Sequence, residues 1–471
     1  MRQPKYLPDP FAFPSPVFSA KACSTYNQSQ RLMATSLLNQ GKELPNLSPL
    51  FFKKFTKFLN LIREMLSQTP YMQPESSNMS VKSILESLLP KDGMLNPNCN
   101  MEEAWLLTLD FCLCCAALAS ASDDRGTTMS WVPMKLSEEA AMAIKELSGS
   151  ILGEPWENGS MEMDFGAIDK GERLMVALMP RIMPILKGSI KETSIDTNED
   201  MVEAACARAP KEYAIVAAHQ LRWWVKQVNQ PHLGKLCAWV IPCALTALDH
   251  WSPEVKGQAM ISFMHLSINM SATEFGSYGD VVLDASYRNI AAADEIWQYA
   301  VEMSVLLLTC IECRNPRSYW YERILGDMLG HLERQPNCKE RRIPWLQQIE
   351  PIFNAMGLVL LAHLKRVMTL FFDWMHADDD RSVLLVLERI YTIMKLIWVR
   401  NTPYLERLVD ELTVTYREAS LRKERFAIRE HVLKIMFLLQ RCKGLEFESA
   451  WSKHKDDPNL VSLTSSLSTV N

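Results

Sequence analysis

Apolar side chains recur at steps of three and four residues through most of the second half of the chain, a pattern that predicts amphipathic helices. Two such stripes lie close together within residues 231–270, and a second pair lies within residues 358–399. A short polar turn separates the two stripes of each pair. The stripes consist of Leu236, Trp239, Val240, Cys243 and Ala247; Val255, Ala259, Ser262, Phe263 and Leu266; Leu361, Leu364, Met368, Phe371 and Met375; and Val383, Leu387, Ile390, Met394 and Ile397.

Turns interrupt this pattern at a regular interval from about residue 210 to about residue 441. Successive turns lie 43, 41, 43, 42 and 41 positions apart, and a shorter bend falls between each pair. Each unit is therefore predicted to contain a helix, a turn, a second helix and a bend. The turns are centred on Pro210, Pro253, Asp294, Asn337, Asp379 and Ser420, and the bends lie at residues 229–231, 269–271, 314–316, 357 and 401–403.

This period predicts an all-α fold, a HEAT- or armadillo-like α-solenoid of helix pairs with a divergent N-terminal helical part. The low glycine content agrees, because 17 glycines among 471 residues leave little material for Gly-rich phosphate loops or tight strand connections. A stack of helix pairs presents a long continuous surface and encloses no pocket of its own. We therefore expect a protein that binds partners rather than an enzyme.

Composition divides the chain into four predicted regions. Residues 1–45 carry repeated prolines among aromatic residues and are expected to form an extended arm. Residues 46–194 contain less regular helices, as expected of the end of an array, and residues 195–445 contain the HEAT-like repeats. The polar, Ser-rich residues 446–471 are expected to be a disordered tail.

One apolar run, residues 104–121, has the length of a membrane span. It contains Thr108 and Asp110, and a carboxylate in the middle of a bilayer costs ~2.5–3.5 kcal/mol on insertion scales. We therefore expect a helix that is buried inside the protein and no membrane partner.

The formal net charge of −5 supplies no basic field of the kind that nucleic-acid binding requires, so nucleic acid is not an expected partner. The first residues are interrupted by prolines and do not resemble a secretory signal. The sequence therefore predicts a cytoplasmic or nuclear location.

A search for catalytic or metal-binding motifs identifies no strong candidate. The cysteines fall mainly on apolar helical stripes, and Cys310 and Cys313 form a lone C-x-x-C without a second pair or a histidine at ligand spacing. There is no phosphate-binding loop, nucleophile elbow or metalloprotease motif. We expect no enzymatic activity, no cofactor and no metal.

Basic residues cluster in two neighbouring segments. Arg341 and Arg342 lie in HLERQPNCKERRIPW, and Lys365 and Arg366 lie in HLKR. A solvated helical face and an anchor for an acidic segment of a partner are both compatible with this pattern. These four residues are the candidate partner-binding site, and the acidic run 378–380 is interpreted as the start of a helix.

Three segments go beyond a generic helical array. They are QPHLGKLCAWVIPCALTALDHWSPEVKGQAMISFMHLSIN at 230–269, RRIPWLQQIEPIFNAMGLVLLAHLKRVMTLFFDWM at 341–375 and VLLVLERIYTIMKLIWVR at 383–400. In order and spacing they resemble the second Tti protein family of the Tel/Tti (Triple T) cochaperone complex, in a plant-type branch described as armadillo-repeat proteins. The resemblance covers residues 231–441, roughly half of the chain.

This resemblance implies a non-enzymatic scaffold whose partners are Tel-type and first-Tti-type solenoids. With the Hsp90 system, such a complex supports the maturation and stability of phosphatidylinositol-3-kinase-related kinases of the TOR, ATM and ATR types. The alternative is a HEAT-repeat adaptor for transport or for phosphatase assembly.

Overall fold

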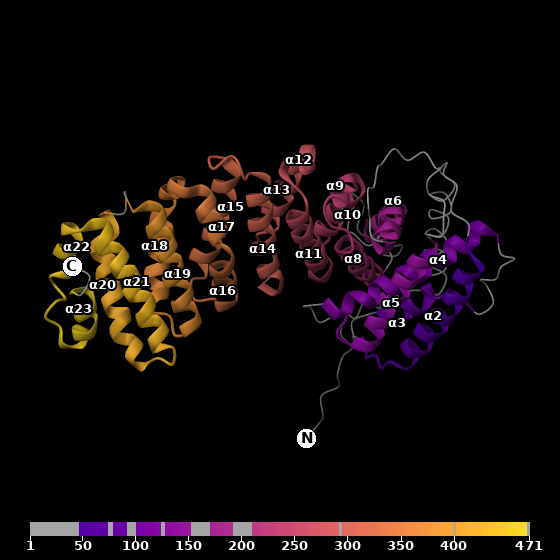
Figure 1. The fold of residues 1–471 in the computed structure, drawn as a ribbon, viewed down its shortest axis with the longest axis horizontal. Helices are drawn as coiled ribbons and strands as arrows, with labels where there is room; N and C mark the ends of the chain where they lie inside the picture. The colour runs from indigo at the N-terminus through magenta and orange to yellow at the C-terminus, as the bar shows by residue number, and fades with distance from the viewer. Residues whose placement is uncertain are drawn as a thin grey trace, which may run out of the picture. The chain divides into compact units, whose positions relative to one another are not determined.

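The computed structural model describes residues 47–73, 79–91, 100–123, 128–151, 170–191, 210–291, 294–398, 400 and 402–468. Within these ranges every regular element is a helix (Figure 1). The predicted all-α, HEAT- or armadillo-like fold is confirmed. The predicted arm, residues 1–45, lies outside the described residues.

The chain forms two compact units. Unit 1 comprises Met1–Gln227 and His250–Val255, and unit 2 comprises Val228–Asp249 and Lys256–Asn471. Unit 1 takes one helix of the predicted repeat region, α8, because α8 packs against α6 and α4. Its helices are α2 (Pro49–Gln68), α3 (Val81–Leu88), α4 (Met101–Ala119), η1 (Ser120–Asp123), α5 (Met134–Ile151), α6 (Lys170–Lys191) and α8 (Lys211–Lys226).

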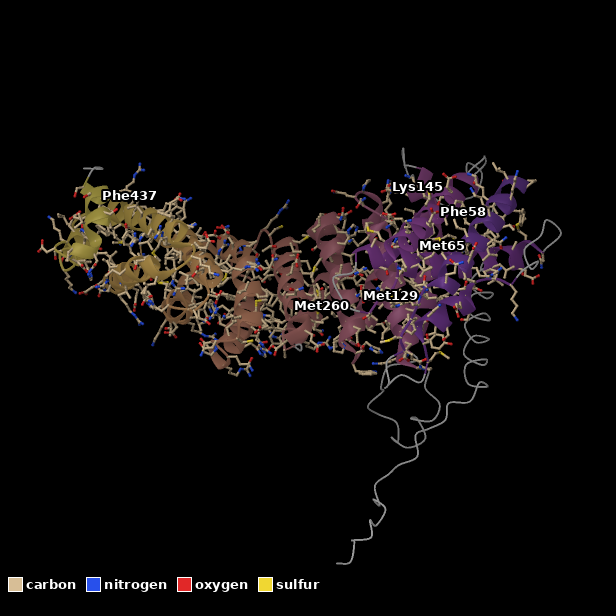
Figure 2. The ribbon with its side chains drawn as sticks, turned by 90° about the horizontal axis from the view of Figure 1, so that it is seen from below. Phe58, Met65, Met129, Lys145, Met260 and Phe437 are labelled. Atoms are coloured by element: carbon tan, nitrogen blue, oxygen red, sulfur yellow. The ribbon has the colours of Figure 1, made fainter. Side chains whose placement is uncertain are left out.

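Helix α4 forms the core of unit 1. It contacts α3, α5 and α8, while α2 packs on α5. Figure 2 labels Phe58 and Met65 on α2 and Lys145 on α5. One helical stretch of the described residues, Met101–Ser122, is long and apolar enough to cross a membrane, and 83% of its apolar 18-residue window is buried inside the protein. In unit 2, Glu350–Ala362 and Leu364–Met375 have that length and composition only when taken together, and they are bent by 111°. The prediction that residues 104–121 form a buried helix is confirmed.

Unit 2 is a stack of helix pairs arranged in two rows. Along the A row, α10, α13, α15, α18 and α20 contact one another in sequence. In the B row, α14, α16, α19 and α21 do the same, and Gly257 of α11 approaches Ile296 and Tyr299 of α14. The A row consists of α10 (Cys237–Leu248), α13 (Gly279–Arg288), α15 (Tyr319–Arg334), α18 (Leu364–Met375) and α20 (Thr402–Glu418), and the B row of α11 (Pro253–Asn269), α14 (Asp294–Ile311), α16 (Lys339–Gln348), α19 (Asp380–Ile397) and α21 (Arg425–Lys443).

The predicted turns from Pro253 onward lead from an A helix to a B helix, whereas Pro210 is the N-cap of α8 in unit 1. Pro253 and Asp294 are the first residues of α11 and α14, and Asp379 is the N-cap of α19. The remaining short elements of unit 2 lie at the bends, at the C-terminal end of the stack or, for η5, at the turn centred on Ser420. They are α9 (His232–Lys235), α12 (Ala272–Phe275), η3 (Gly276–Tyr278), α17 (Glu350–Met356), η4 (Gly357–Ala362), η5 (Ala419–Leu421), α22 (Leu445–Trp451), η6 (Pro458–Leu460) and α23 (Val461–Ser468).

The apolar stripes of unit 2 form its core, with two exceptions. Trp239 and Leu361 are only half-buried, whereas the other stripe residues are buried. The helix expected from residue 358 is also interrupted. Gly357 adopts a φ of +51°, which ends α17, and η4 intervenes before α18 begins at Leu364.

The tail was predicted to be disordered, and this prediction is wrong for residues 446–468. These residues form most of α22 together with η6 and α23, and Leu460, Leu463 and Leu467 are buried. The three leucines lie three and four positions apart, so they form an apolar stripe within a Ser-rich segment. The tail packs on α20 and α21 and closes the end of the stack.

Candidate functional site

The four basic residues predicted to bind a partner lie at the starts of two helices of unit 2. Arg341 and Arg342 are in the first turn of α16, and Lys365 and Arg366 are in the first turn of α18. The structure gives the four side chains different environments. They do not form a single exposed basic patch.

Arg342 is buried by its own chain. Its Nη2 donates to Asp379 Oδ2 at 2.6 Å, its Nε donates to Ser382 Oγ at 2.9 Å, and only 4% of its side chain is exposed. Its charge is neutralised within the protein, so Arg342 offers no charge to a partner. This burial corrects the expectation that all four residues lie on an accessible surface.

Arg341 and Arg366 also pair with carboxylates of neighbouring helices. Arg341 Nε lies 2.5 Å from Asp294 Oδ1, and its guanidinium lies 5.1 Å from the centre of the Trp297 ring. Arg366 binds Glu333 through two hydrogen bonds of 2.7 Å. Lys365 differs, because its side chain is exposed and forms no ion pair with the described residues.

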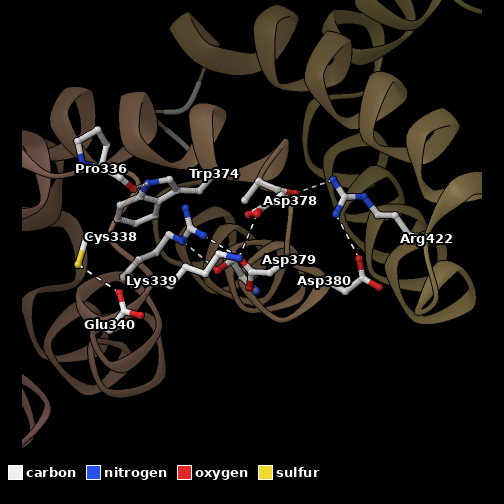
Figure 3. A network of polar contacts seen from close by, with 12 residues as sticks. Pro336, Cys338, Lys339, Glu340, Trp374, Asp378, Asp379, Asp380 and Arg422 are labelled. Carbon is white, nitrogen blue, oxygen red and sulfur yellow. Dashed lines mark hydrogen bonds and ion pairs between the residues drawn. The ribbon is translucent and has the colours of Figure 1, made fainter.

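The acidic run that follows α18 supplies the partner of Arg342 and of two further cations (Figure 3). Asp379 accepts from the backbone N–H of Ser382 at 2.7 Å, so the predicted helix start is confirmed. Each of the three aspartates also pairs with a different cation, all from neighbouring repeats. The pairs are Asp378 with Lys339, Asp379 with Arg342, and Asp380 with Arg422.

Burial raises the pKa of Asp379, but the hydrogen bonds from Ser382 and the charge of Arg342 outweigh this effect. The pKa of Asp379 therefore lies below its ordinary value. The carboxylate stays ionised near neutral pH, which keeps the pair with Arg342 intact.

Polar contacts recur between consecutive repeats throughout unit 2. Their partners are separated by 39 to 44 residues, which is one repeat. The sequence analysis did not predict this series of contacts, although residues of opposite charge one repeat apart in the sequence were a signal for it. The contacts join Arg288 to Asp249, Arg323 to Asp284, Trp320 to Asp280, Cys310 to the Met270 carbonyl, Arg389 to Glu350, Arg417 to Asp457, Arg422 to Asp380 and His454 to Asp410.

His376, at the end of α18, bridges two carboxylates of α20. Its Nδ1 lies 2.9 Å from Glu418 Oε2, and its Nε2 lies 3.0 Å from Glu411 Oε2. Burial lowers the pKa of His376, but the two carboxylates raise it by more, so the pKa lies above its ordinary value. A protonated imidazole donates from both nitrogens, and this contact therefore joins two repeats most strongly when His376 is charged.

The described residues provide no accessible catalytic arrangement. Ser120 Oγ lies 3.1 Å from His219 Nδ1, but both side chains are buried in unit 1 and cannot meet a substrate. In the described ranges, no group of three or more His, Cys, Asp or Glu residues could hold a metal ion. An open depression in unit 1 is lined by Arg63, Ser67, Glu86, Leu89, Pro90 and Lys91.

The cysteines that lie on apolar stripes behave as apolar residues. Cys112, Cys114 and Cys115 of α4 are completely buried, and burial raises the pKa of Cys112 to about 12. Cys310 is half-buried, and Cys313 is exposed. Thiols with raised pKa values are poor nucleophiles and poor metal ligands.

Comparison with solved structures identifies matches of low sequence identity. A crystal structure of Kap121p has a TM-score of 0.43 and 10% identity, and the match covers 89% of this chain and 45% of Kap121p. A structure of Kap95p with RanGDP has a TM-score of 0.46 and 11% identity, covering 96% of this chain and 69% of that one. Both scores are below 0.5, and the fold assignment rests on the helix packing described above.

Two mammalian relatives match part of the sequence. TELO2-interacting protein 2 of Rattus norvegicus is 22% identical over 196 residues, and that of Mus musculus is 21% identical over 196 residues. Each match covers 39% of this chain and 38% of the relative, so less than half of either protein is spanned. This distant similarity and the helical-repeat fold are compatible with a scaffold or adaptor protein.

No family model matches the sequence, but a plant relative matches almost the whole chain. The protein At2g39910 of Arabidopsis thaliana, described as uncharacterized, is 49% identical over 405 residues, which cover 86% of this chain and 91% of the relative. Identity at this level over most of both chains shows common descent, and the chain belongs to the same family as Arabidopsis thaliana At2g39910.

Proposed function

We propose that this protein is a non-enzymatic scaffold that holds other proteins together in a cochaperone assembly. The observation that carries the proposal is the similarity to TELO2-interacting protein 2 over 196 residues. The architecture of unit 2 supports it, because stacked helix pairs act through an extended binding surface. The buried setting of Ser120 and His219 and the lack of a metal-binding cluster among the described residues are compatible with a binding role.

The partners in this proposal are a Tel-type and a first-Tti-type solenoid. Together with the Hsp90 system, the assembly supports the folding and stability of phosphatidylinositol-3-kinase-related kinases of the TOR, ATM and ATR types. It acts in the cytoplasm or the nucleus. These finer assignments follow from the resemblance of residues 230–269, 341–375 and 383–400 to the second Tti protein family.

Affinity purification of the full chain from its native organism, combined with a null line, tests this proposal. We expect a Tel-type and a first-Tti-type protein to be recovered in stoichiometric amounts. In the null line, TOR-type and ATM-type kinases should fall in steady-state level while their transcripts are unchanged, because loss of a cochaperone acts after translation. Expression of the full chain in the null line is the control and should restore kinase levels.

Two results contradict the proposal. The first is the absence of both partners from the purified material together with unchanged kinase levels in the null line. The second is recovery of a nuclear-transport GTPase or a phosphatase catalytic subunit, which would favour the alternative of a transport or phosphatase adaptor.

A further inference from the structure

We propose that one edge of unit 2 is a docking surface for an acidic segment of a partner protein that carries large apolar residues at regular intervals. We call it the bend edge, because B helices end and A helices begin there. It lies along the upper side of unit 2 in Figure 1, where α12 and α22 are labelled. The bend edge consists of residues 268–271, 311–319, 357–363, 395–398, 400 and 441–446.

Each of five consecutive bends exposes one large apolar side chain. The exposed fractions are 70% for Ile268, 56% for Tyr319, 58% for Leu358, 49% for Trp398 and 89% for Leu445. Single exposed apolar residues are normal on protein surfaces. These five lie at successive bends, either at the end of a B helix or at the start of the element that follows it, so they form a row along one edge. A row of exposed apolar residues is typical of a binding surface.

The spacing of this row defines the geometry of the partner. Packed helices lie about 8–10 Å apart, so neighbouring bends are separated by about 10 Å. A polyproline II segment covers that distance in about three residues, because each residue advances about 3.1 Å, and its three residues per turn place every third side chain on the same face. A partner segment in this conformation with an apolar residue at every third position can therefore reach successive bends.

The charges of the bend edge indicate that the partner segment is negatively charged. Arg314, Arg317, Lys395, Arg400 and Arg441 are all exposed, and none of them forms an ion pair with a described residue. In the same stretches the acidic residues are Glu312 and Glu446, of which Glu446 lies 3.8 Å from Lys443. In a protein with a net charge of −5, this edge has a local excess of cations.

The opposite edge, where A helices end and B helices begin, also exposes the cations Arg381 and Lys423, but it carries the acidic run 378–380 as well. There Lys339, Arg342 and Arg422 each pair with an aspartate of the run 378–380. These cations stabilise the stack and are already neutralised. The bend-edge cations named above have no carboxylate partner among the described residues, which leaves their charges available to an external acidic group.

A protein segment fits these observations better than a nucleic acid. The exposed side chains between the cations include the aliphatic Ile268, Leu358 and Leu445, which bury area against apolar side chains but do not stack with bases. The proposed docking surface thus specifies how the scaffold proposed above binds a partner, and the proposal rests on that function. The surface itself is inferred only from exposure and charge.

Binding of synthetic peptides to the full chain tests the proposal. The probe is a fluorescein-labelled peptide of five Glu-Glu-Leu repeats, which places a leucine at every third position. We expect it to bind with an affinity that falls as salt rises. Two comparison peptides, five repeats of Glu-Glu-Ser and five of Lys-Lys-Leu, lack the apolar residues or the negative charge and should each bind at least about tenfold more weakly.

Variants of the chain then locate the binding surface. The apolar variant combines Leu358→Ser, Trp398→Ser and Leu445→Ser, and the charge variant combines Arg314→Glu, Arg317→Glu and Arg400→Glu. Each should weaken binding of the acidic peptide at least about tenfold. The matched controls on the opposite edge are Leu421→Ser with Phe426→Ser and Arg381→Glu with Lys423→Glu, all at exposed positions, and they should change affinity less than about twofold.

Several results overturn the docking surface. They are a failure of the acidic peptide to bind the parent chain, equal losses in the control variants, tighter binding of a single-stranded RNA oligonucleotide, and a dimer in sedimentation that the apolar variant dissociates. Circular dichroism verifies that each variant keeps the parent's helix content. If both bend-edge variants restore kinase levels in the null line, the edge is not used while the scaffold function stands. If the acidic peptide binds the parent chain but the null line keeps its kinase levels, the docking surface stands and the proposed scaffold function fails.

Discussion

The buried guanidinium of Arg342 and the partly buried carboxylate of Asp379 form an ion pair across consecutive repeats, with Nη2 and Oδ2 2.6 Å apart. The two residues are 37 positions apart in the sequence. Asp379 also caps α19 by accepting from the Ser382 N–H. One carboxylate therefore stabilises both the start of a helix and its contact with the preceding helix of the B row.

We expect Arg342→Ala to lower the free energy of unfolding by about 1–3 kcal/mol, because it leaves the partly buried carboxylate of Asp379 without its cation. Lys339→Ala removes the cation of a pair with exposed side chains, Lys339–Asp378, and should cost about 0–1 kcal/mol. Urea unfolding followed by circular dichroism measures both values. Equal losses in the two variants would show that burial of the Arg342 pair is unimportant.

The contact of His376 with Glu411 and Glu418 should make stability depend on pH. Since the folded pKa of His376 is raised, its contribution is complete below the ordinary histidine pKa of about 6.5 and is lost as the pH rises through the folded value. We expect the stability difference between the parent and His376→Gln to be larger at pH 6 than at pH 8.5. Urea midpoints at both pH values give this difference, and a difference that does not change with pH contradicts the prediction.

Phe263 and Phe371 are completely buried in the stack, and Phe371 lies 6.2 Å from Trp345 between ring centres. Phe→Ala at either position should cost about 3–5 kcal/mol, because the change removes apolar contacts and leaves a cavity. Phe426→Ala is the matched control, since 73% of that side chain is exposed, and should change stability by less than about 0.5 kcal/mol. Thermal and urea unfolding distinguish these outcomes.

Thiol reactivity should follow burial. We expect iodoacetamide at pH 8 to modify the exposed Cys313 in the native protein and to modify Cys112, Cys114 and Cys115 only after unfolding, because burial raises their pKa values and blocks access. Peptide mass spectrometry identifies the modified sites. Cys313→Ser should remove the early modification, and rapid labelling of α4 in the native chain would show that this helix is not in a closed core.

The sequence predicted the local elements of unit 2 well. The stripes from Val255 to Leu266 and from Val383 to Ile397 became buried faces of α11 and α19, and the turns at Pro253 and Asp379 became helix starts. These features depend on neighbours a few positions apart, which a periodic pattern records directly. The prediction that the tail is disordered was wrong because its serines outnumber the three buried leucines that pack it against the stack.

The candidate site was predicted only in part. Arg341, Arg342 and Arg366 were identified as basic residues near one another in the sequence, but their roles depend on carboxylates 33 to 47 positions away. Whether a cation is neutralised or free is decided by which acidic side chain the stacking brings beside it. Composition and spacing along the chain do not contain that information.

The sequence by itself determined the helical class, the repeat of about 42 residues and the residues that enter the core, because each follows from local periodicity. Only the tertiary structure decided which charged side chains are neutralised by ion pairs inside the stack and which remain unpaired at the bend edge. The physical reason is that ion pairing and exposure depend on distances of a few ångströms between residues about one repeat apart. Those distances exist only once the repeats have packed, as Arg342 and the free Arg400 illustrate.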